Sequence, residues 1–227
     1  MSSSIPSVLL DLDGTLIDSQ PGILASCRVA LRALGHEPGA ALDIAAIIGP
    51  PIEDVVRLLV KPYQDDRVDE AVAAYRKDYG VNGLFESKLY PGIVDALREI
   101  REASASVRLY LATSKRTIFA RRILEHLELA TYFDGIYGSE TGGALDHKPE
   151  LIAHILSQHG LQPDYSVMVG DRRYDITGAH ANRMRAVGVL WGYGTRNELE
   201  AAGADQLIGA PEDLARGALA TINGQLG

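Results

Sequence analysis

Short apolar runs alternate with segments of helical periodicity along most of the chain. The first run, residues 7–12 (SVLLDL), is followed directly by turn-forming residues, and the runs 107–112, 166–169 and 186–190 are of the same kind. Near-continuous apolar runs are typical of parallel strands that are covered on both faces. Their alternation with helices predicts an α/β fold, a doubly wound parallel sheet with a Rossmann-like core, in which ligands bind beyond the carboxyl ends of the strands.

The region from residue 17 to residue 89 interrupts this alternation. It shows no convincing strand but has three segments with amphipathic helical periodicity: 21–34, 51–60 and 67–79. Glycine and proline residues separate these segments, as expected for turns between helices. We therefore predict an all-helical domain at 17–89, inserted into an α/β core formed by residues 1–16 and 90–227.

The composition is that of a globular protein with an acidic surface. The 227 residues are 46% hydrophobic and 23% charged, and the formal net charge is −8. This charge argues against nucleic-acid binding, because phosphate backbones attract cations. Neither a secretory signal pattern nor an apolar stretch long enough to span a bilayer is evident, so we expect a cytoplasmic protein without a membrane partner. The single cysteine, Cys27, lies in an apolar helical pattern and is expected in the core.

Two carboxylates, Asp11 and Asp13, stand at the exit of the first predicted strand in the string DLDGT. An aspartate–glycine pair also occurs in ordinary turns, where the carboxylate caps backbone amides. The position at a strand end is, however, where α/β sheets bind their ligands. This position favours a catalytic role for the two aspartates.

A second pair of carboxylates, Asp171 and Asp175, follows the apolar run 166–169. Aspartates are also common at helix starts, so this string alone is weak evidence for a site. Because both pairs follow strands, they could converge on one edge of the sheet and repel one another. A divalent cation would relieve the repulsion, and magnesium prefers hard oxygen ligands.

Three potential donors to an anion complete the pattern. Thr113 and Ser114 follow the run 107–112, although taken alone they are better explained as an ordinary helix N-cap. Lys148 precedes a predicted helix, where a lone lysine is usually a solvated charge. Together with the carboxylates, these donors indicate metal-assisted phosphoryl transfer, with one carboxylate as nucleophile and a second that exchanges protons.

In their order and spacing, these four strings resemble motifs I to IV of the haloacid dehalogenase superfamily, and the resemblance covers essentially the whole chain. It implies that Asp11 is the nucleophile and Asp13 the general acid/base. It implies a Mg²⁺ cofactor bound by the Asp11 carboxylate, the Asp13 backbone carbonyl and Asp171, with Asp175 as a further ligand or as a partner of one. The predicted helical domain corresponds to the C1 cap, which closes over the substrate and sets specificity.

The resemblance also implies a phosphate site. Its members would be Gly14, Thr113, Ser114 and Lys148, with Thr113 and Lys148 also contributing to catalysis. Within the predicted cap, the candidates for contacts with the rest of the substrate are Gly49, Pro50, Arg57, Arg76 and Tyr79. The alternative for both arginines is that they are ordinary exposed helix charges. Further cations beside the motifs could attract an anionic substrate, namely Lys115, Arg116, Arg172 and Arg173. The alternative, which is favoured, is that they are ordinary charges, because loops at helix starts carry mixed charge in any case.

The residue types distinguish branches of the superfamily. Dehalogenases and phosphonatases lack an aspartate at the position of Asp13, so the chain resembles a phosphatase or a mutase. The β-phosphoglucomutase branch usually carries valine in place of Thr15, which favours hydrolysis and leaves a phosphomutase as the alternative. A catalytically inactive binding module is a third reading, against which the complete set of motif residues argues.

Among the phosphatases, three segments are similar to the phosphoglycolate phosphatase-like group: 48–54, 84–92 and 138–144. We therefore expect a magnesium-dependent phosphatase that hydrolyses a small phosphorylated metabolite, such as phosphoglycolate, a sugar phosphate or a nucleotide. The sequence leaves open whether the enzyme acts as a monomer or as a homodimer.

Overall fold

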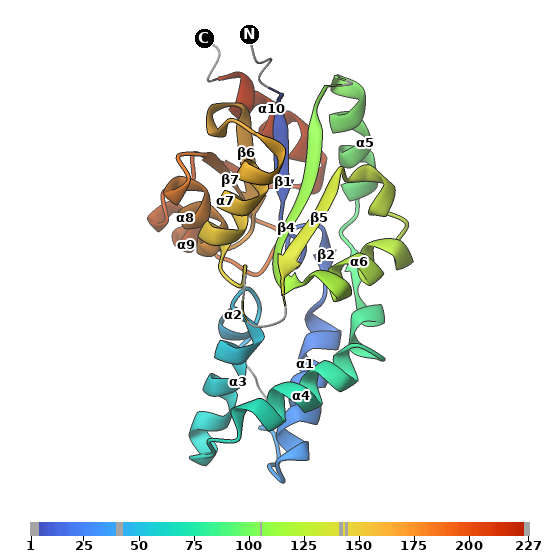
Figure 1. The fold of residues 1–227 in the computed structure, drawn as a ribbon, viewed down its shortest axis with the longest axis vertical. Helices are drawn as coiled ribbons and strands as arrows, with labels where there is room; N and C mark the ends of the chain where they lie inside the picture. Colours follow the sequence, from blue (N-terminus) through green and yellow to red (C-terminus); the bar gives the residue numbers. More distant parts are fainter. Residues whose placement is uncertain (1–4, 40–42, 105, 141–142, 144, 225–227) are drawn as a thin grey trace.

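The computed structural model describes residues 5–39, 43–104, 106–140, 143 and 145–224 (Figure 1). Its centre is a six-stranded sheet with the strand order β5-β4-β1-β6-β7-β8, in which all neighbouring strands are parallel. Four strands correspond to the predicted apolar runs: β1 (Ser7–Leu10), β4 (Arg108–Arg116), β6 (Ser166–Gly170) and β7 (Arg185–Val189). The predicted parallel α/β sheet is therefore confirmed.

The two edge strands, β5 (Gly135–Ser139) and β8 (Gln206–Ile208), lie outside the predicted runs. Edge strands are covered less completely than central ones, so their sequences need not be uniformly apolar. The first three residues of β5 and the first two of β8 are only partly buried. Their mixed composition explains why the hydrophobic pattern does not reveal them.

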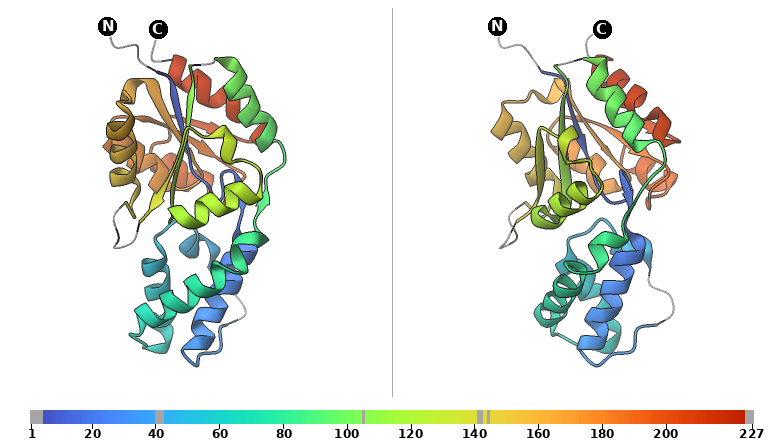
Figure 2. Two further views of the ribbon diagram at one scale, coloured as in Figure 1. Left: turned by 45° about the vertical axis from the view of Figure 1, so that its right-hand side comes forward. Right: turned by 90° about the vertical axis from the view of Figure 1, so that its right-hand side faces the viewer.

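Helices cover both faces of the sheet (Figure 2). Leu9 of β1 packs on one face, against α7 (Lys148–His159), α8 (Arg173–Ala181) and α9 (Arg196–Ala201). Val8 and Leu10 pack on the other face, against α5 (Ile93–Ala103), α6 (Thr117–His126) and α10 (Leu214–Asn223). Because successive side chains of β1 enter different cores, its sequence is continuously apolar from Val8 to Leu10, as a doubly wound sheet requires.

Between β1 and α5 the chain forms a group of helices beyond the carboxyl end of the sheet (Figures 1 and 2). These are α1 (Gln20–Ala33), α2 (Ile44–Ile47), α3 (Ile52–Val60) and α4 (Val68–Tyr79). α1, α3 and α4 lie within one residue of the predicted bounds. The predicted apolar face of α4 is buried, except that Val68 is only partly covered. Cys27 is buried in α1, as expected, and burial raises the pKa of its thiol to about 12.

The expectation of no strand between residues 17 and 89 is wrong at its two ends. β2 (Ile17–Asp18) pairs antiparallel with β3 (Lys88–Leu89), where the chain leaves the sheet and returns to it. Two residues are too short to show a periodic pattern, which is why the sequence does not indicate this pair. The domain boundaries after residues 16 and 89 stay a prediction.

Five short 3₁₀ helices complete the described chain: η1 (Lys61–Tyr63), η2 (Gly83–Glu86), η3 (Ala130–Tyr132), η4 (Pro163–Tyr165) and η5 (Pro211–Asp213). Among the described helices, none is both long enough and apolar enough to cross a bilayer. Residues 141, 142 and 144 of the segment 138–144 lie outside the described residues.

Candidate active site

Aspartates from two neighbouring strand ends meet at one edge of the sheet. Asp11 follows β1, and Asp171 follows β6, which pairs with β1 along its whole length. Asp175 lies in the first turn of α8. All three side chains are buried, and one oxygen of each lies within 4.8 Å of the others. The structure thus brings together three of the four predicted metal ligands through their carboxylates.

A lysine stands inside this carboxylate cluster. The Lys148 ammonium lies 2.7 Å from Asp11 Oδ1 and 2.6 Å from Asp175 Oδ1, and it donates to the backbone carbonyl of Ala112 at 2.6 Å. Burial alone would lower the pKa of Lys148, but the charges of the two aspartates outweigh burial and raise it. Lys148 is therefore a fixed buried cation, not the solvated surface charge that a lone lysine usually is.

The electrostatics of the cluster suit a divalent cation. Burial raises the pKa of Asp11 to about 7, although Lys148 opposes the shift, and burial also raises the pKa of Asp171 well above its usual value. Oδ1 of Asp171 is buried and has no hydrogen-bond partner among the described residues. The three carboxylates together carry more negative charge than Lys148 can neutralise when they are ionised. Such a set of oxygens fits a hard cation such as Mg²⁺.

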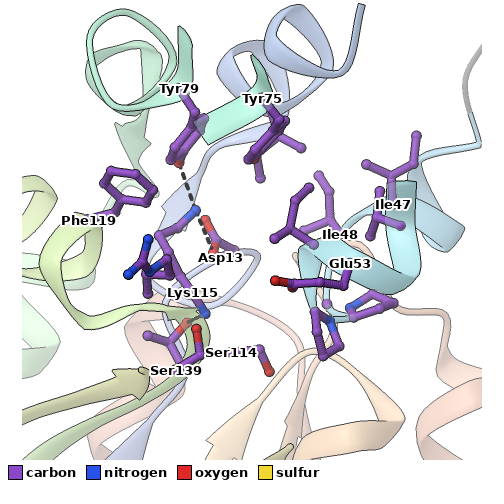
Figure 3. Close-up of a pocket in the computed structure, with 18 of the residues that line it drawn as sticks. Asp13, Ile47, Ile48, Glu53, Tyr75, Tyr79, Ser114, Lys115, Phe119 and Ser139 are labelled. Carbon is purple, nitrogen blue, oxygen red and sulfur yellow. Dashed lines mark hydrogen bonds and ion pairs between the residues drawn. The ribbon is translucent and has the colours of Figure 1, made fainter. Parts of the chain in front are cut away.

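The carboxylate of Asp13 is separate from this cluster. Its Oδ2 lies 3.0 Å from the ammonium of Lys115, and its Oδ1 is buried without a hydrogen-bond partner in the described part of the chain. Asp11 and Asp13 both line a pocket at this edge of the sheet. Figure 3 shows Asp13 in the pocket, joined to Lys115. The resemblance assigned only the Asp13 backbone carbonyl to the metal, and that assignment stays a prediction.

Thr113 and Ser114 line the same pocket from an irregular end of β4. Between the pairs Ala112–Tyr137 and Arg116–Ser139, β4 advances four residues while β5 advances two. Such a bulge interrupts the regular ladder and redirects side chains. The hydroxyl of Thr113 accepts a hydrogen bond from the backbone N–H of Lys115 at 3.2 Å. β4 thus continues past the predicted end at residue 112 and carries these donors to the pocket.

Gly14 is placed differently from the prediction. It does not line the pocket, and its φ of +83° is a backbone conformation that favours glycine. A Cβ atom at this position would lie 2.2 Å from Oδ2 of Asp171. Gly14 therefore allows the loop after β1 to approach Asp171 closely, and the structure shows no role for it in the phosphate pocket.

The segment Trp191–Gly194 supports the site and was not among the predicted residues. The backbone N–H of Tyr193 donates to Oδ2 of Asp171 at 2.7 Å, and its hydroxyl donates to Asp18 at 2.8 Å. A Cβ atom on Gly194 would lie 1.9 Å from the backbone oxygen of Asp171, so the loop packs tightly. The sequence signal was present, because the alternating aromatics and glycines of WGYG directly follow the predicted run 186–190.

A known family matches most of this chain: its model, described as haloacid dehalogenase-like hydrolase, covers residues 8–189. The chain belongs to this family. A 5′-nucleotidase of Pseudomonas aeruginosa is 39% identical over 198 residues, which are 86% of this chain and 87% of that protein. A predicted phosphatase from Clostridium acetobutylicum has a similar structure, with a TM-score of 0.86, 34% identity and coverage of 96% and 99% of the two chains.

The tyrosine-protein kinase PtkA of Mycobacterium tuberculosis is 42% identical over 188 residues. These residues are 82% of this chain but only 62% of PtkA, so the chain spans less than two thirds of that relative. Phosphoglycolate phosphatases are also among the similar proteins. Together with the family match, the similarity to phosphatases identifies this haloacid dehalogenase-like protein as a phosphoric monoester hydrolase.

In this phosphatase, the helical segment forms the outer wall of the pocket. Gly49, Pro50, Arg76 and Tyr79 line it, as does Glu53, which was not predicted. A terminal nitrogen of Arg76 donates to Oε1 of Glu53 at 2.6 Å, so an ion pair joins α3 and α4 at the pocket.

Arg57 is not brought to the site. Its side chain is 60% exposed, does not line the pocket, and pairs with Asp54 one helical turn earlier at 2.6 Å. Arg57 is therefore an ordinary exposed charge on a helix, because its position on α3 directs the side chain to solvent.

Three of the cations beside the motifs pair with carboxylates: Lys115, Lys148 and Arg172. Arg172 is 3% exposed, donates to Glu198 at 2.9 Å and to the backbone carbonyl of Ile48. Lys115 and Lys148 are in the ion pairs described above, so these two cations organise the site by pairing with its aspartates. Arg172 in addition connects the core to the segment before α3. The exposed guanidinium of Arg173 donates to the hydroxyl of Tyr174 at 2.9 Å, and Arg116 lines the pocket.

Proposed function

We propose that this phosphatase is magnesium-dependent and hydrolyses a small phosphorylated metabolite through a phosphoryl group carried transiently on Asp11. The observation that supports this proposal is that Asp11 belongs to both parts of the site, the carboxylate cluster and the pocket. It belongs to the buried carboxylate cluster with Asp171 and Asp175, and it also lines the pocket, which those two residues do not. A carboxylate that touches both a cation site and a substrate pocket is placed to act as a nucleophile.

Two steps follow from this geometry. In the first, an oxygen of Asp11 attacks phosphorus, the ester P–O bond breaks, and Asp13 gives a proton to the leaving oxygen. In the second, water attacks the phosphorus and gives a proton to Asp13, while the bond to Asp11 breaks. The products are an alcohol and inorganic phosphate, and both carboxylates return to their starting states.

The other predicted residues have supporting roles in this scheme. Lys148 holds Asp11 and neutralises part of the charge of the cluster. Thr113 and Ser114, at the irregular end of β4, would donate to the phosphoryl oxygens. Asp171 and Asp175 would hold Mg²⁺ together with Asp11. Mg²⁺, when bound, supplies positive charge that stabilises the phosphoryl oxygens during transfer.

The pocket favours a substrate with an apolar, planar leaving group. Much of its lining is apolar or aromatic: Ile23, Ile47, Ile48, Pro50, Pro51, Ile52, Val55, Tyr75, Tyr79 and Phe119 (Figure 3). The paired side chains of Glu53 and Arg76 add hydrogen-bonding groups at this wall. Such a lining suits a nucleoside better than the small acid of phosphoglycolate. The similarity to a 5′-nucleotidase supports the same choice, so we propose a nucleotide-like monoester as the substrate class.

The test is phosphate release from p-nitrophenyl phosphate by the wild type and by Asp11→Asn, with Mg²⁺ and with a chelator. We expect release that needs Mg²⁺ and is lost in the variant. A screen of nucleoside 5′-monophosphates, sugar phosphates and phosphoglycolate then tests the substrate class. Release that survives in Asp11→Asn would contradict the role of Asp11, and return of phosphate to a sugar in place of its release would indicate a mutase.

A further inference from the structure

Three side chains from different parts of the fold form a hydrogen-bonded chain beside the nucleophile. Lys115 Nζ lies 3.0 Å from Oδ2 of Asp13 and donates to the hydroxyl of Tyr79 at 2.7 Å (Figure 3). Asp13 lies in the loop after β1, Lys115 in the irregular end of β4, and Tyr79 in the last turn of α4. These three hydrogen-bonded side chains therefore connect the proposed general acid/base to the helical segment that covers the pocket.

This hydrogen-bonded group is buried, and ring packing holds it at Tyr79. The side chain of Lys115 is 8% exposed, that of Asp13 is 12% exposed, and Tyr79 is fully buried. The ring of Tyr79 stacks on Tyr75 at 5.4 Å and meets Phe119 of α6 edge-on at 5.6 Å. An ion pair with so little access to solvent is screened weakly. The attraction between Lys115 and Asp13 therefore keeps most of its strength.

The two oxygens of Asp13 have different surroundings. Oδ2 is occupied by Lys115, whereas Oδ1 is buried and has no hydrogen-bond partner among the described residues. We propose that Lys115 is a positioning residue for Asp13: its ion pair with Oδ2 fixes the orientation in which the Asp13 carboxyl group exchanges the proton with the leaving group, and Tyr79 fixes Lys115 from the helical segment. This inference rests on the proposed function, in which Asp13 protonates the leaving oxygen.

Protonation matters most when the leaving group is basic. A strongly acidic phenol departs without a proton, while a weakly acidic one needs the general acid. Loss of a positioning residue should therefore slow poor leaving groups more than good ones. Loss of a direct contact between Lys115 and the substrate phosphate would slow all leaving groups by a similar factor, because every monoester carries the same phosphate.

The experiment measures kcat/KM for a series of substituted phenyl phosphates, from dinitrophenyl phosphate to unsubstituted phenyl phosphate. Lys115→Met should lose roughly tenfold or more on phenyl phosphate and less than about threefold on dinitrophenyl phosphate. Asp13→Asn should show the same trend with a larger loss. The double variant should be no worse than Asp13→Asn, because Lys115 acts through Asp13.

Tyr79→Phe and Tyr75→Phe form a matched pair on the same face of α4. Tyr79→Phe keeps the ring but removes the bond to Lys115, and it should show the leaving-group dependence of Lys115→Met to a smaller degree. The hydroxyl of Tyr75 makes no hydrogen bond to Lys115 within the described residues, so Tyr75→Phe should leave the dependence unchanged. If Lys115→Met does not fold, Tyr79→Phe carries the test.

The outcomes separate the inference from the proposed function. A parallel loss across the whole series in both Lys115→Met and Tyr79→Phe, with a graded loss in Asp13→Asn, overturns the positioning role. A gain on phenyl phosphate in Lys115→Met overturns it as well. A uniform loss in Asp13→Asn itself shows instead that the proposed role of Asp13 is wrong.

Discussion

Asp11 is a buried carboxylate whose proton binding depends on folding. Burial raises its pKa from 3.8 to about 7, so the folded metal-free protein keeps a proton that the unfolded chain releases near pH 4. The stability that this proton binding contributes is fully present below about pH 4 and is lost as the pH rises to about 7. The charge state of one residue thus makes the stability of the apoprotein depend on pH.

This dependence is measured by thermal unfolding in chelator with Asp11→Asn as the comparison, since its amide does not titrate. We expect the Tm of the wild type to fall relative to that of Asp11→Asn between about pH 4 and about pH 7. Saturating Mg²⁺ should reduce the difference, because the cation favours the ionised carboxylate. A difference that stays constant across this range would contradict the raised pKa.

Gly14 shows how a residue without a side chain shapes the site. Gly14→Ala places a Cβ atom 2.2 Å from Asp171 Oδ2, so we expect the Asp171 carboxylate to move. Gly35→Ala is the matched control, because Gly35 has a similar φ of +86° but no atom within 4 Å of its Cβ position. Each variant should lose about 1 kcal/mol from backbone strain, but only Gly14→Ala should also lose phosphatase activity, about tenfold or more. Equal activities in the two variants would show that the contact with Asp171 is unimportant.

At the scale of the elements, sequence periodicity shows where a helix lies, but it does not show where each polar side chain of that helix points. The helical period predicts α3 and α4 to within one residue, because each helix buries one continuous apolar face. It does not show which polar residues of the opposite face meet the pocket. Arg76 faces Glu53 there, while Arg57 points to solvent. The orientation of the helices on the sheet decides between the two arginines.

Arg76→Ala and Arg57→Ala test this difference on neighbouring helices. Removal of Arg76 leaves Glu53 unpaired at the pocket wall, so we expect a raised KM, about tenfold, or a changed order of preference among phosphorylated metabolites. Arg57→Ala should leave both unchanged, because an exposed ion pair contributes little. Both quantities come from steady-state kinetics on the same substrate panel. An equal effect of the two substitutions would exclude a role for Arg76 in recognition.

At the scale of the whole molecule, the carboxylate cluster connects the central strands. Asp11 follows β1 and Asp171 follows β6, so a cation between them joins two loops that the sheet positions. Ligands that bind only the folded state stabilise it by mass action, by about 2.7 kcal/mol at 100 times the Kd. Metal binding should therefore be visible in global unfolding.

We expect Mg²⁺ to raise the Tm of the wild type in a concentration-dependent manner and to have a much smaller effect on Asp171→Asn. Asp95→Asn is the control for unspecific charge effects, because Asp95 is 69% exposed and pairs with Arg98 on α5. Its Mg²⁺ response should match that of the wild type. If Asp171→Asn responds like the wild type, the cluster is not the metal site.

The sequence by itself determined the four central strands of the sheet and the position of the aspartates and Lys148 at strand ends or a helix start. Central parallel strands are buried on both faces, so the apolar runs mark them directly. The sequence does not show which of the site residues are in contact. Lys148 and Asp11 are 137 residues apart in the sequence, and Tyr193 and Asp18 are 175 residues apart. Local periodicity contains no information on such pairs.

The tertiary structure alone decided how the charges of the site are matched. It placed Lys115 on Asp13, Lys148 among the other aspartates, and Arg172 against Glu198 and Ile48. The sequence showed the same cations beside the motifs, where each could have faced solvent or substrate. Burial makes the difference, because an ion without solvent must find a partner, and only the packing of sheet, loops and helices determines which partner is within reach.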